Sequence, residues 1–334
     1  MNLSRATTLT GSLLALSLMA VAMGLMTGSL GWDWQVDWQD PIVQDIRLPR
    51  TLGAWLAGAL LGLAGALAQG LFRNPLADPY LLGSASGASL GVALALAMGM
   101  WGYAETEHFS FAMQWWFRLG LTGMAFIGAW LAVLLTLMLA RGAEQTLRLL
   151  LAGVVVGVVL GAVTSLVSLA FPQILPAMQS FLLGNTSLLS GQACIMLAAV
   201  WLVCLALSCL LSPLLDALRL GEATAQSLGL QVGPLRLLLL AVMGLATASA
   251  VAQTGLIAFV GLVAPHLVRS RVQGPYALLL VLSSLMGGML LTTADVLARG
   301  LWAPQELPVG VLTGVLGGGY LLWRLHSPTA KAME

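Results

Sequence analysis

About ten long apolar stretches follow one another along this chain of 334 residues, each bounded by charged residues or by glycine and proline clusters. A helix that crosses a bilayer needs about 20 apolar residues, because each residue advances it by only about 1.5 Å. The sequence therefore predicts an all-α, polytopic membrane protein of about ten spans. The expected spans are residues 9–30, 48–70, 81–101, 119–140, 147–170, 191–212, 235–253, 256–270, 276–299 and 308–325.

The low content of charged side chains supports this interpretation and argues against a soluble domain or a nucleic-acid-binding protein. Only 8% of the residues are charged and the mean hydropathy is +0.94, whereas soluble domains carry about 25% charged residues. Such a chain lacks the polar groups that a water-facing surface requires. A net charge of +1 also argues against nucleic acid as a partner, because nucleic-acid binding calls for a basic face.

The basic residues are distributed unequally between the two sets of loops that ten spans would create. One set, which includes both termini, carries ten basic residues, and the opposite set carries four. Loops rich in Lys and Arg stay on the cytoplasmic side. We therefore expect a multi-pass protein of the inner (plasma) membrane with both termini in the cytoplasm.

The sequence carries no motif for chemistry of its own. It has no Gly-x-x-x-x-Gly-Lys-Ser/Thr loop for nucleotide phosphates, and its three histidines match no zinc spacing. We expect no catalytic residues, no metal site and no cofactor. Buried ionisable residues, the mark of an ion-coupled carrier, are not evident. The favoured interpretation is a membrane pathway that receives its energy from another subunit. A secondary transporter and a non-transporting membrane scaffold are the less favoured alternatives.

The largest predicted inner connection, residues 213–235, combines polar residues with leucine and alanine at helical spacing. Gly221 and Gly229 bracket a short helix that begins at Glu222, where a carboxylate suits the helix dipole. With Arg219 as its one flanking basic residue, the segment is poorly suited to anionic lipid. Docking to a protein is the favoured interpretation.

Six segments in a fixed order resemble a known family. The most distinctive reads Asn-Pro-Leu-Ala-Asp-Pro-Tyr at residues 74–80, and another reads Phe-Val-Gly-Leu-Val-Ala-Pro-His at residues 259–266. Together they resemble the FecCD family, the permease subunits of type II ABC importers, which take up vitamin B12, ferric siderophores and haem. The resemblance covers almost the whole chain and implies one transmembrane permease domain, residues 1–334. The six segments are residues 46–52, 74–83, 149–153, 220–222 with 227–229, 259–266, and 294–299 with 306–310.

The resemblance implies a machine of several subunits. Two copies of this chain would form a homodimer with two cytoplasmic ATPase subunits, which use the ATP, and one external substrate-binding protein. The expected cargo is a ferric siderophore or cobalamin, with haem as the alternative. Residues 213–235 would hold the coupling helices, with ATPase contacts at Leu220, Gly221, Glu222, Ala225, Leu228 and Gly229.

The family resemblance also suggests residues for docking and for the translocation path. Arg47, Arg50 and Arg299 match positions that bind glutamates of the binding protein, and guanidinium pairs well with carboxylate. The alternative is that these arginines reach lipid headgroups or pair with Asp45 and Asp295. Ser86, Gln145 and Thr146 are candidates for an inner gate. Small residues and hydroxyls in the fifth span, among them Thr164, Ser165 and Ser168, would give a weakly binding wall or serve only helix packing.

Overall fold

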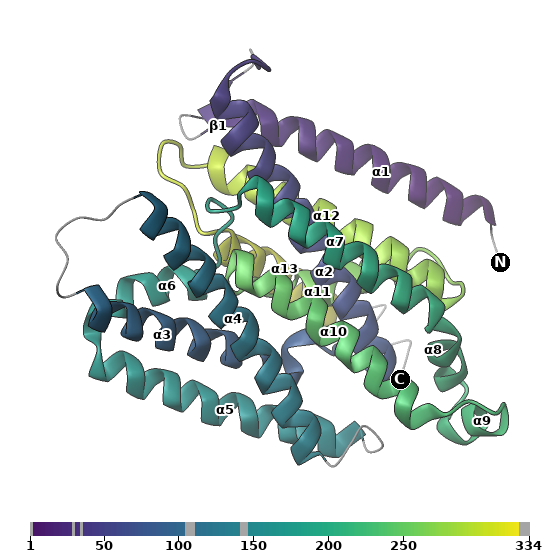
Figure 1. The fold of residues 1–334 in the computed structure, drawn as a ribbon. Coiled ribbons are helices and arrows are strands. Elements are labelled where there is room, and N and C mark those ends of the chain that lie inside the picture. Colours follow the sequence, from purple (N-terminus) through teal and green to yellow (C-terminus); the bar gives the residue numbers. More distant parts are fainter. Residues whose placement is uncertain (1–2, 29–30, 34–35, 104–110, 141–145, 327–334) are drawn as a thin grey trace.

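The computed structural model of the chain describes residues 3–28, 31–33, 36–103, 111–140 and 146–326. It is a bundle of helices with one two-stranded hairpin (Figure 1). Ten long or apolar helices occupy the ten expected stretches. They are α1 (Leu3–Met26), α2 (Leu48–Leu71), α3 (Ser84–Tyr103), α4 (Phe111–Leu139), α5 (Thr146–Ala170), α7 (Gly191–Leu210), α10 (Val232–Thr254), α11 (Val260–Arg269), α12 (Tyr276–Gly300) and α13 (Val309–His326).

Shorter elements connect these helices. The strands β1 (Thr27–Gly28) and β2 (Gly31–Trp32) form the hairpin directly after α1, so the first helix ends earlier than the expected residue 30. Seven helices among the described residues are long and apolar enough to cross a membrane, and α3 and α11 contribute shorter apolar stretches. The remaining elements are η1 (Val43–Arg47), η2 (Pro79–Leu82), η3 (Pro172–Ile174), α6 (Leu175–Leu183), α8 (Ser212–Arg219) and α9 (Glu222–Ser227).

Helix α2 forms the centre of the bundle, with 83% of its most apolar window buried. Its glycines allow neighbouring backbones to approach it closely, as in other small-residue helix contacts in membranes. A Cβ on Gly62 would stand 2.2 Å from the carbonyl oxygen of Ser283 in α12, and a Cβ on Gly65 only 1.7 Å from that of Gly261 in α11. Glycine is therefore required where α2 crosses these two helices.

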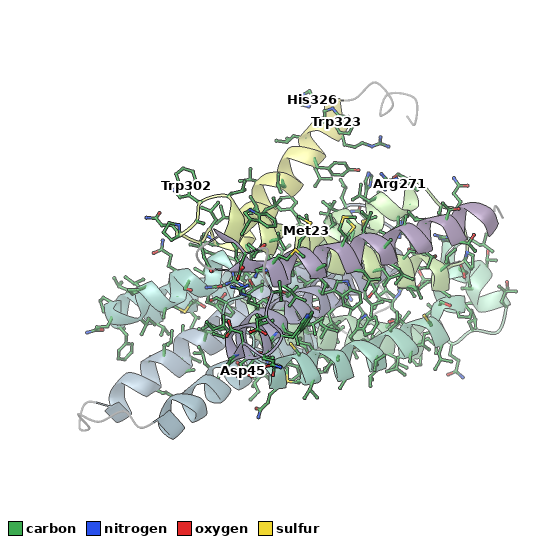
Figure 2. The ribbon with its side chains drawn as sticks, turned by 90° about the horizontal axis from the view of Figure 1, so that it is seen from above. Met23, Asp45, Arg271, Trp302, Trp323 and His326 are labelled. Carbon is green, nitrogen blue, oxygen red and sulfur yellow. The ribbon has the colours of Figure 1, made fainter. Side chains whose placement is uncertain are left out.

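Other helices lie at the margin. Only 17% of the corresponding window of α5 and 28% of that of α1 are buried, so each presents a wide apolar face outward. Figure 1 shows α1 along one edge of the bundle, and Figure 2 shows α13 projecting from the bundle with Trp323 and His326 at its outer end. In a membrane, such faces are covered by lipid or by another protein chain.

The two ends of the bundle differ in structure (Figure 1). The hairpin end holds β1 and β2, the start of α2 and the end of α12. The opposite end, here called the α9 end, holds α8 and α9 together with the end of α2 and the start of α12. The residues singled out from the sequence fall mainly at these two ends.

Candidate functional site

The segment between α7 and α10 folds as two short helices, α8 and α9, that protrude from the α9 end. The expected short helix is present, and both bracketing glycines have positive φ angles, +111° at Gly221 and +81° at Gly229. Side-chain-bearing residues rarely adopt this conformation, so glycine permits the two sharp turns. The turns set α9 off from the bundle as a separate element.

An ion pair and a buried alanine hold α9 in place. Arg236 Nη1 in α10 lies 3.1 Å from Glu222 Oε1 at the start of α9, and the Arg236 side chain is buried. Ala225 is also buried and belongs to the main apolar core. Ala225 therefore anchors α9 from beneath and does not offer an outward contact, which corrects the expectation for this residue.

Two leucines of the same segment are exposed on its outer surface. Leu220 is 71% exposed and Leu228 is 63% exposed, although both are large apolar side chains in a polar connection. They flank α9 on either side, next to Gly221 and Gly229. The segment thus combines a fixed backbone with an unpartnered apolar surface, as expected of a protein-docking element.

At the hairpin end, a buried cluster of charges joins α2 to α12. Arg50 Nε and Nη2 donate to Asp295 Oδ1, each at 3.2 Å, and Arg50 Nη1 lies 2.9 Å from Glu306 Oε2. Arg299 Nη2 lies 2.7 Å from Asp295 Oδ2, and the Thr186 hydroxyl also donates to Asp295. The fully buried Asp295 side chain thus contacts both arginines, and Asp295 and Glu306 together balance their two positive charges within the protein.

The three arginines expected to dock a binding protein are all engaged within the chain. Arg299 is buried, and its Nη1 donates to the carbonyl oxygens of Gly24 and Thr27 at 3.0 and 2.7 Å. Arg47 pairs with Asp33 at 3.2 Å, and its side chain keeps 14% exposure. In the structure, Arg50 and Arg299 both pair with Asp295 of the same chain. Of the three, Arg47 has the most accessible side chain.

Removal of the shared carboxylate should destabilise the protein strongly. In Asp295→Ala, Arg299 and part of Arg50 lose their counter-charge in a buried position, which costs on the order of 3–5 kcal/mol. We expect a large fall in the melting temperature of the purified protein, measured by intrinsic tryptophan fluorescence. Asp45→Ala removes an exposed carboxylate from the same end (Figure 2) and serves as the control. Equal melting temperatures for the two variants would contradict this account.

The candidate gate and path residues are distributed over α3 and α5. Ser86 Oγ lies 3.6 Å from the position of a Cβ on Gly157, so it is at the α3–α5 contact. The hydroxyls of Thr164, Ser165 and Ser168 donate to backbone carbonyls one turn earlier in α5. Thr146 is the first residue of α5, and Gln145 lies outside the described residues. The structure brings Ser86 close to α5 but does not join these residues into one cluster.

The most distinctive motif, residues 74–83, shapes the connection between α2 and α3. Asp78 Oδ1 accepts from Tyr80 N at 2.8 Å, and the Tyr80 hydroxyl donates to the carbonyl of Ile257 at 3.0 Å. Burial raises the pKa of the Asp78 carboxyl, while the hydrogen bond from Tyr80 N opposes this shift. The motif thus ties the first half of the chain to the α10–α11 connection.

No group of three or more potential metal ligands occurs within the described ranges.

The pairing of Arg299 with Asp295, which the sequence offered as an alternative to docking, is present in the structure. The two residues are four apart on one helix, a spacing that places both on one face. The Glu222–Arg236 pair had no such signal, since the two residues belong to different helices. Glu306 likewise meets Arg50 only through the fold, over a separation of 256 residues.

The chain is a helical bundle with several candidate membrane spans and a protruding short-helix segment at one end. Residues 8–327 match the FecCD transport family, and the chain belongs to this family. It is thus a permease of the ABC importer class.

Three relatives show the breadth of that family. The hemin transport system permease protein HmuU of Yersinia pestis is 37% identical, over 93% of this chain and 92% of its own. The vitamin B12 import system permease protein BtuC of Salmonella typhimurium is 36% identical, over 94% of each chain. The Fe(3+)-citrate import system permease protein YfmE of Bacillus subtilis is 33% identical, over 96% of this chain and 93% of its own.

Solved structures support the same fold. A metal-chelate type ABC transporter in an inward-facing conformation superposes with a TM-score of 0.82 at 28% identity, over 95% of this chain and 99% of that chain. PsaBC from Streptococcus pneumoniae, at 17% identity and a TM-score of 0.59, shares the fold over 87% of this chain and 93% of its own. The all-α permease fold expected from the sequence is confirmed.

Proposed function

We propose that this chain forms the membrane pathway of an importer for a metal chelate or corrinoid and works with a separate ATPase and an external binding protein. The observation that carries the proposal is the α8–α9 segment, which is fixed from below by Ala225 and Arg236 and exposes Leu220 and Leu228. An ATP-driven pathway whose own chain lacks a nucleotide-binding motif needs such a surface to receive mechanical work from a separate ATPase. The family membership of the chain supports the same conclusion.

The external partner would meet the hairpin end. We assign the direct docking contact to Arg47, whose pair with Asp33 is partly exposed and can exchange for a carboxylate of the partner. Arg50 and Arg299 would instead hold α1, α2 and α12 in the shape that the partner recognises, because both arginines already form ion pairs with Asp295 or Glu306. In this proposal the α9 end and both termini lie in the cytoplasm, as the distribution of basic residues between the loops supports.

Two identical permeases would enclose the pathway between them. The apolar outer face of α5 supports this homodimer, since it is largely unburied in the single chain and carries the hydroxyls of Thr164, Ser165 and Ser168. These hydroxyls bond to their own helix, so they would offer a transported molecule only weak contacts. A wall of this kind suits a bulky chelate that has to pass without being retained.

The cargo that we favour is a ferric siderophore or cobalamin, with haem as the second candidate. The relatives carry hemin, vitamin B12 and ferric citrate in their names at similar identities of 33–37%, which supports the chelate class as a whole. The test is uptake into proteoliposomes that contain the permease–ATPase complex, with the binding protein outside. Labelled ferric siderophore, cobalamin and haem are compared at equal concentration, with and without ATP.

We expect one chelate to enter only when ATP and the binding protein are both present. Uptake that persists without ATP and collapses on addition of an uncoupler would instead indicate an ion-coupled secondary transporter. A partner that binds without any solute flux would indicate a membrane scaffold. If none of the three chelates enters the vesicles, the proposed substrate class is wrong.

Charge reversal at Arg47 should slow docking without unfolding the permease. In Arg47→Glu, we expect uptake at limiting binding protein to fall about tenfold or more, and the loss to shrink when binding protein is in excess, because charges at an interface rim act mainly on the association rate. Arg148→Glu, at the exposed start of α5 on the opposite end, is the matched control. Equal uptake by the two variants at every concentration would remove Arg47 from the docking surface.

A further inference from the structure

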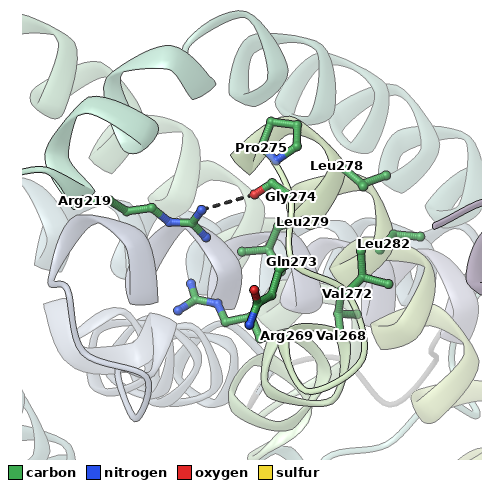
Figure 3. A pocket seen from close by; sticks show the side chains of 10 residues that line it. All are labelled: Arg219, Val268, Arg269, Val272, Gln273, Gly274, Pro275, Leu278, Leu279 and Leu282. Carbon is green, nitrogen blue, oxygen red and sulfur yellow. Dashed lines mark hydrogen bonds between the residues drawn. The ribbon is translucent and has the colours of Figure 1, made fainter. Parts of the chain in front are cut away.

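A pocket of about 350 Å³ lies at the α9 end, between the end of α8 and the connection from α11 to α12 (Figure 3). Two arginines from different helices meet beside it: Arg219 is the last residue of α8, and Arg269 is the last residue of α11. They are separated by 50 residues in the sequence, so only the fold brings them together. The remaining lining residues are Val268, Val272, Gln273, Gly274, Pro275, Leu278, Leu279 and Leu282.

A buried tyrosine positions both guanidinium groups. The Arg219 guanidinium lies 4.3 Å from the centre of the Tyr276 ring and that of Arg269 lies 5.5 Å from it. Arg219 Nη1 also donates to the carbonyl of Gly274 at 3.2 Å, and Arg269 Nη2 donates to the Tyr276 hydroxyl. These contacts hold the two guanidinium groups at one place.

One acidic group, Asp216, lies near the two arginines, and both of its carboxylate oxygens already accept hydrogen bonds. Asp216 Oδ1 is 3.7 Å from Arg219 Nη1, while both Asp216 oxygens accept from the backbone N–H of Tyr276, at 3.1 and 3.2 Å. Two arginines against one aspartate leave an excess of one positive charge at the pocket. Such a site attracts an anion of one to two negative charges.

The rest of the pocket is apolar and extends into the spanning part of α12. Leu279 and Leu282 are buried and lie one turn apart on α12, and Leu278 adds a third apolar wall. In Figure 3 the two arginines lie on one side of the Gly274–Pro275 turn, and Leu278 and Leu282 lie on the other. The pocket is therefore cationic near the start of α12, where a bilayer has its headgroups, and apolar toward the hydrocarbon.

We infer that this pocket binds an anionic phospholipid, with the phosphate against Arg219 and Arg269 and the first part of an acyl chain along Leu278 and Leu279. Basic pockets between membrane helices are suited to acidic lipid headgroups. The sequence disfavoured anionic lipid at this segment because Arg219 was its one flanking basic residue. Arg269 changes this conclusion, and a docking protein would leave the apolar half unexplained.

The test is native mass spectrometry of the full-length permease with phosphatidylglycerol or phosphatidylcholine at equal concentration. We expect phosphatidylglycerol to be retained more tightly, and Arg219→Gln/Arg269→Gln to weaken it about 30-fold, because each basic residue near an anionic surface contributes about fivefold. Arg148→Gln, at the exposed start of α5, should leave the preference unchanged. Arg219→Gln alone, which alters a half-exposed side chain, should give about a fivefold loss if the double variant does not fold.

Three results would overturn the inference. The first is an unchanged preference for phosphatidylglycerol in folded Arg219→Gln/Arg269→Gln. The second is complete displacement of the lipid by millimolar glycerol phosphate, which would assign the pocket to a soluble anion. The third is intact lipid binding with lost ATPase binding in the variant, which would assign the two arginines to the protein partner.

Discussion

ATP-driven uptake should fall to background in Leu220→Asp/Leu228→Asp, although the permease itself stays folded. Both leucines are exposed on the α8–α9 segment, so aspartate costs little within the chain. At an apolar interface, however, two buried and unpaired carboxylates remove several kcal/mol of association free energy. The measurement is co-purification of the ATPase with tagged permease, followed by uptake in proteoliposomes.

The control for this variant is Leu301→Asp, because Leu301 is also well exposed, at 60%, but lies at the hairpin end. It should leave co-purification of the ATPase unchanged. Normal co-purification with Leu220→Asp/Leu228→Asp would show that the ATPase binds elsewhere. An unchanged melting temperature in both variants separates the loss of docking from unfolding.

The largest effect on stability is expected at Gly65, where α2 crosses α11. A Cβ at this position would overlap the carbonyl oxygen of Gly261, a backbone atom that cannot move without separating the two helices. Overpacking in a well-packed core commonly costs about 1–3 kcal/mol, and a backbone overlap exceeds that range. We therefore expect Gly65→Leu to yield no monodisperse protein in size-exclusion chromatography.

The matched substitution is Gly11→Leu in α1, where nothing lies within 4 Å of an added Cβ. This change adds the same side chain to the same kind of helix but meets no neighbour. We expect its elution profile and melting temperature to equal those of the parent protein. A monodisperse, stable Gly65→Leu would show that α2 and α11 do not pack as the structure has them.

The spans could be predicted from the sequence because length and hydropathy decide whether a helix can cross a bilayer. Their arrangement could not be predicted in this way. Helices α2 and α5 are both long and apolar, yet the first is at the centre and the second at the margin. Hydropathy does not distinguish burial in protein from burial in lipid. Glycine spacing does not distinguish them either, because α5 also carries glycines four residues apart, at Gly153, Gly157 and Gly161.

The candidate site was predictable where a feature is local and unpredictable where it depends on distant helices. The bracketing glycines at Gly221 and Gly229 signal two turns, and both are present. The pairing of Arg50 with Glu306 joins residues 256 positions apart, so no local pattern contains it. For the same reason the arginines at the hairpin end looked available for docking, although two of them are buried.

The central position of α2 has a consequence for how the protein is made. Its partners α10, α11 and α12 begin at residues 232, 260 and 276, so they leave the ribosome roughly ten seconds or more after α2, at about 5–20 residues per second. During that interval Gln69, whose side-chain amide later donates to the carbonyl of Leu262, has no such acceptor. Until the second half is synthesised, the Gln69 amide and the glycine face of α2 therefore lack the partners that they have in the folded chain.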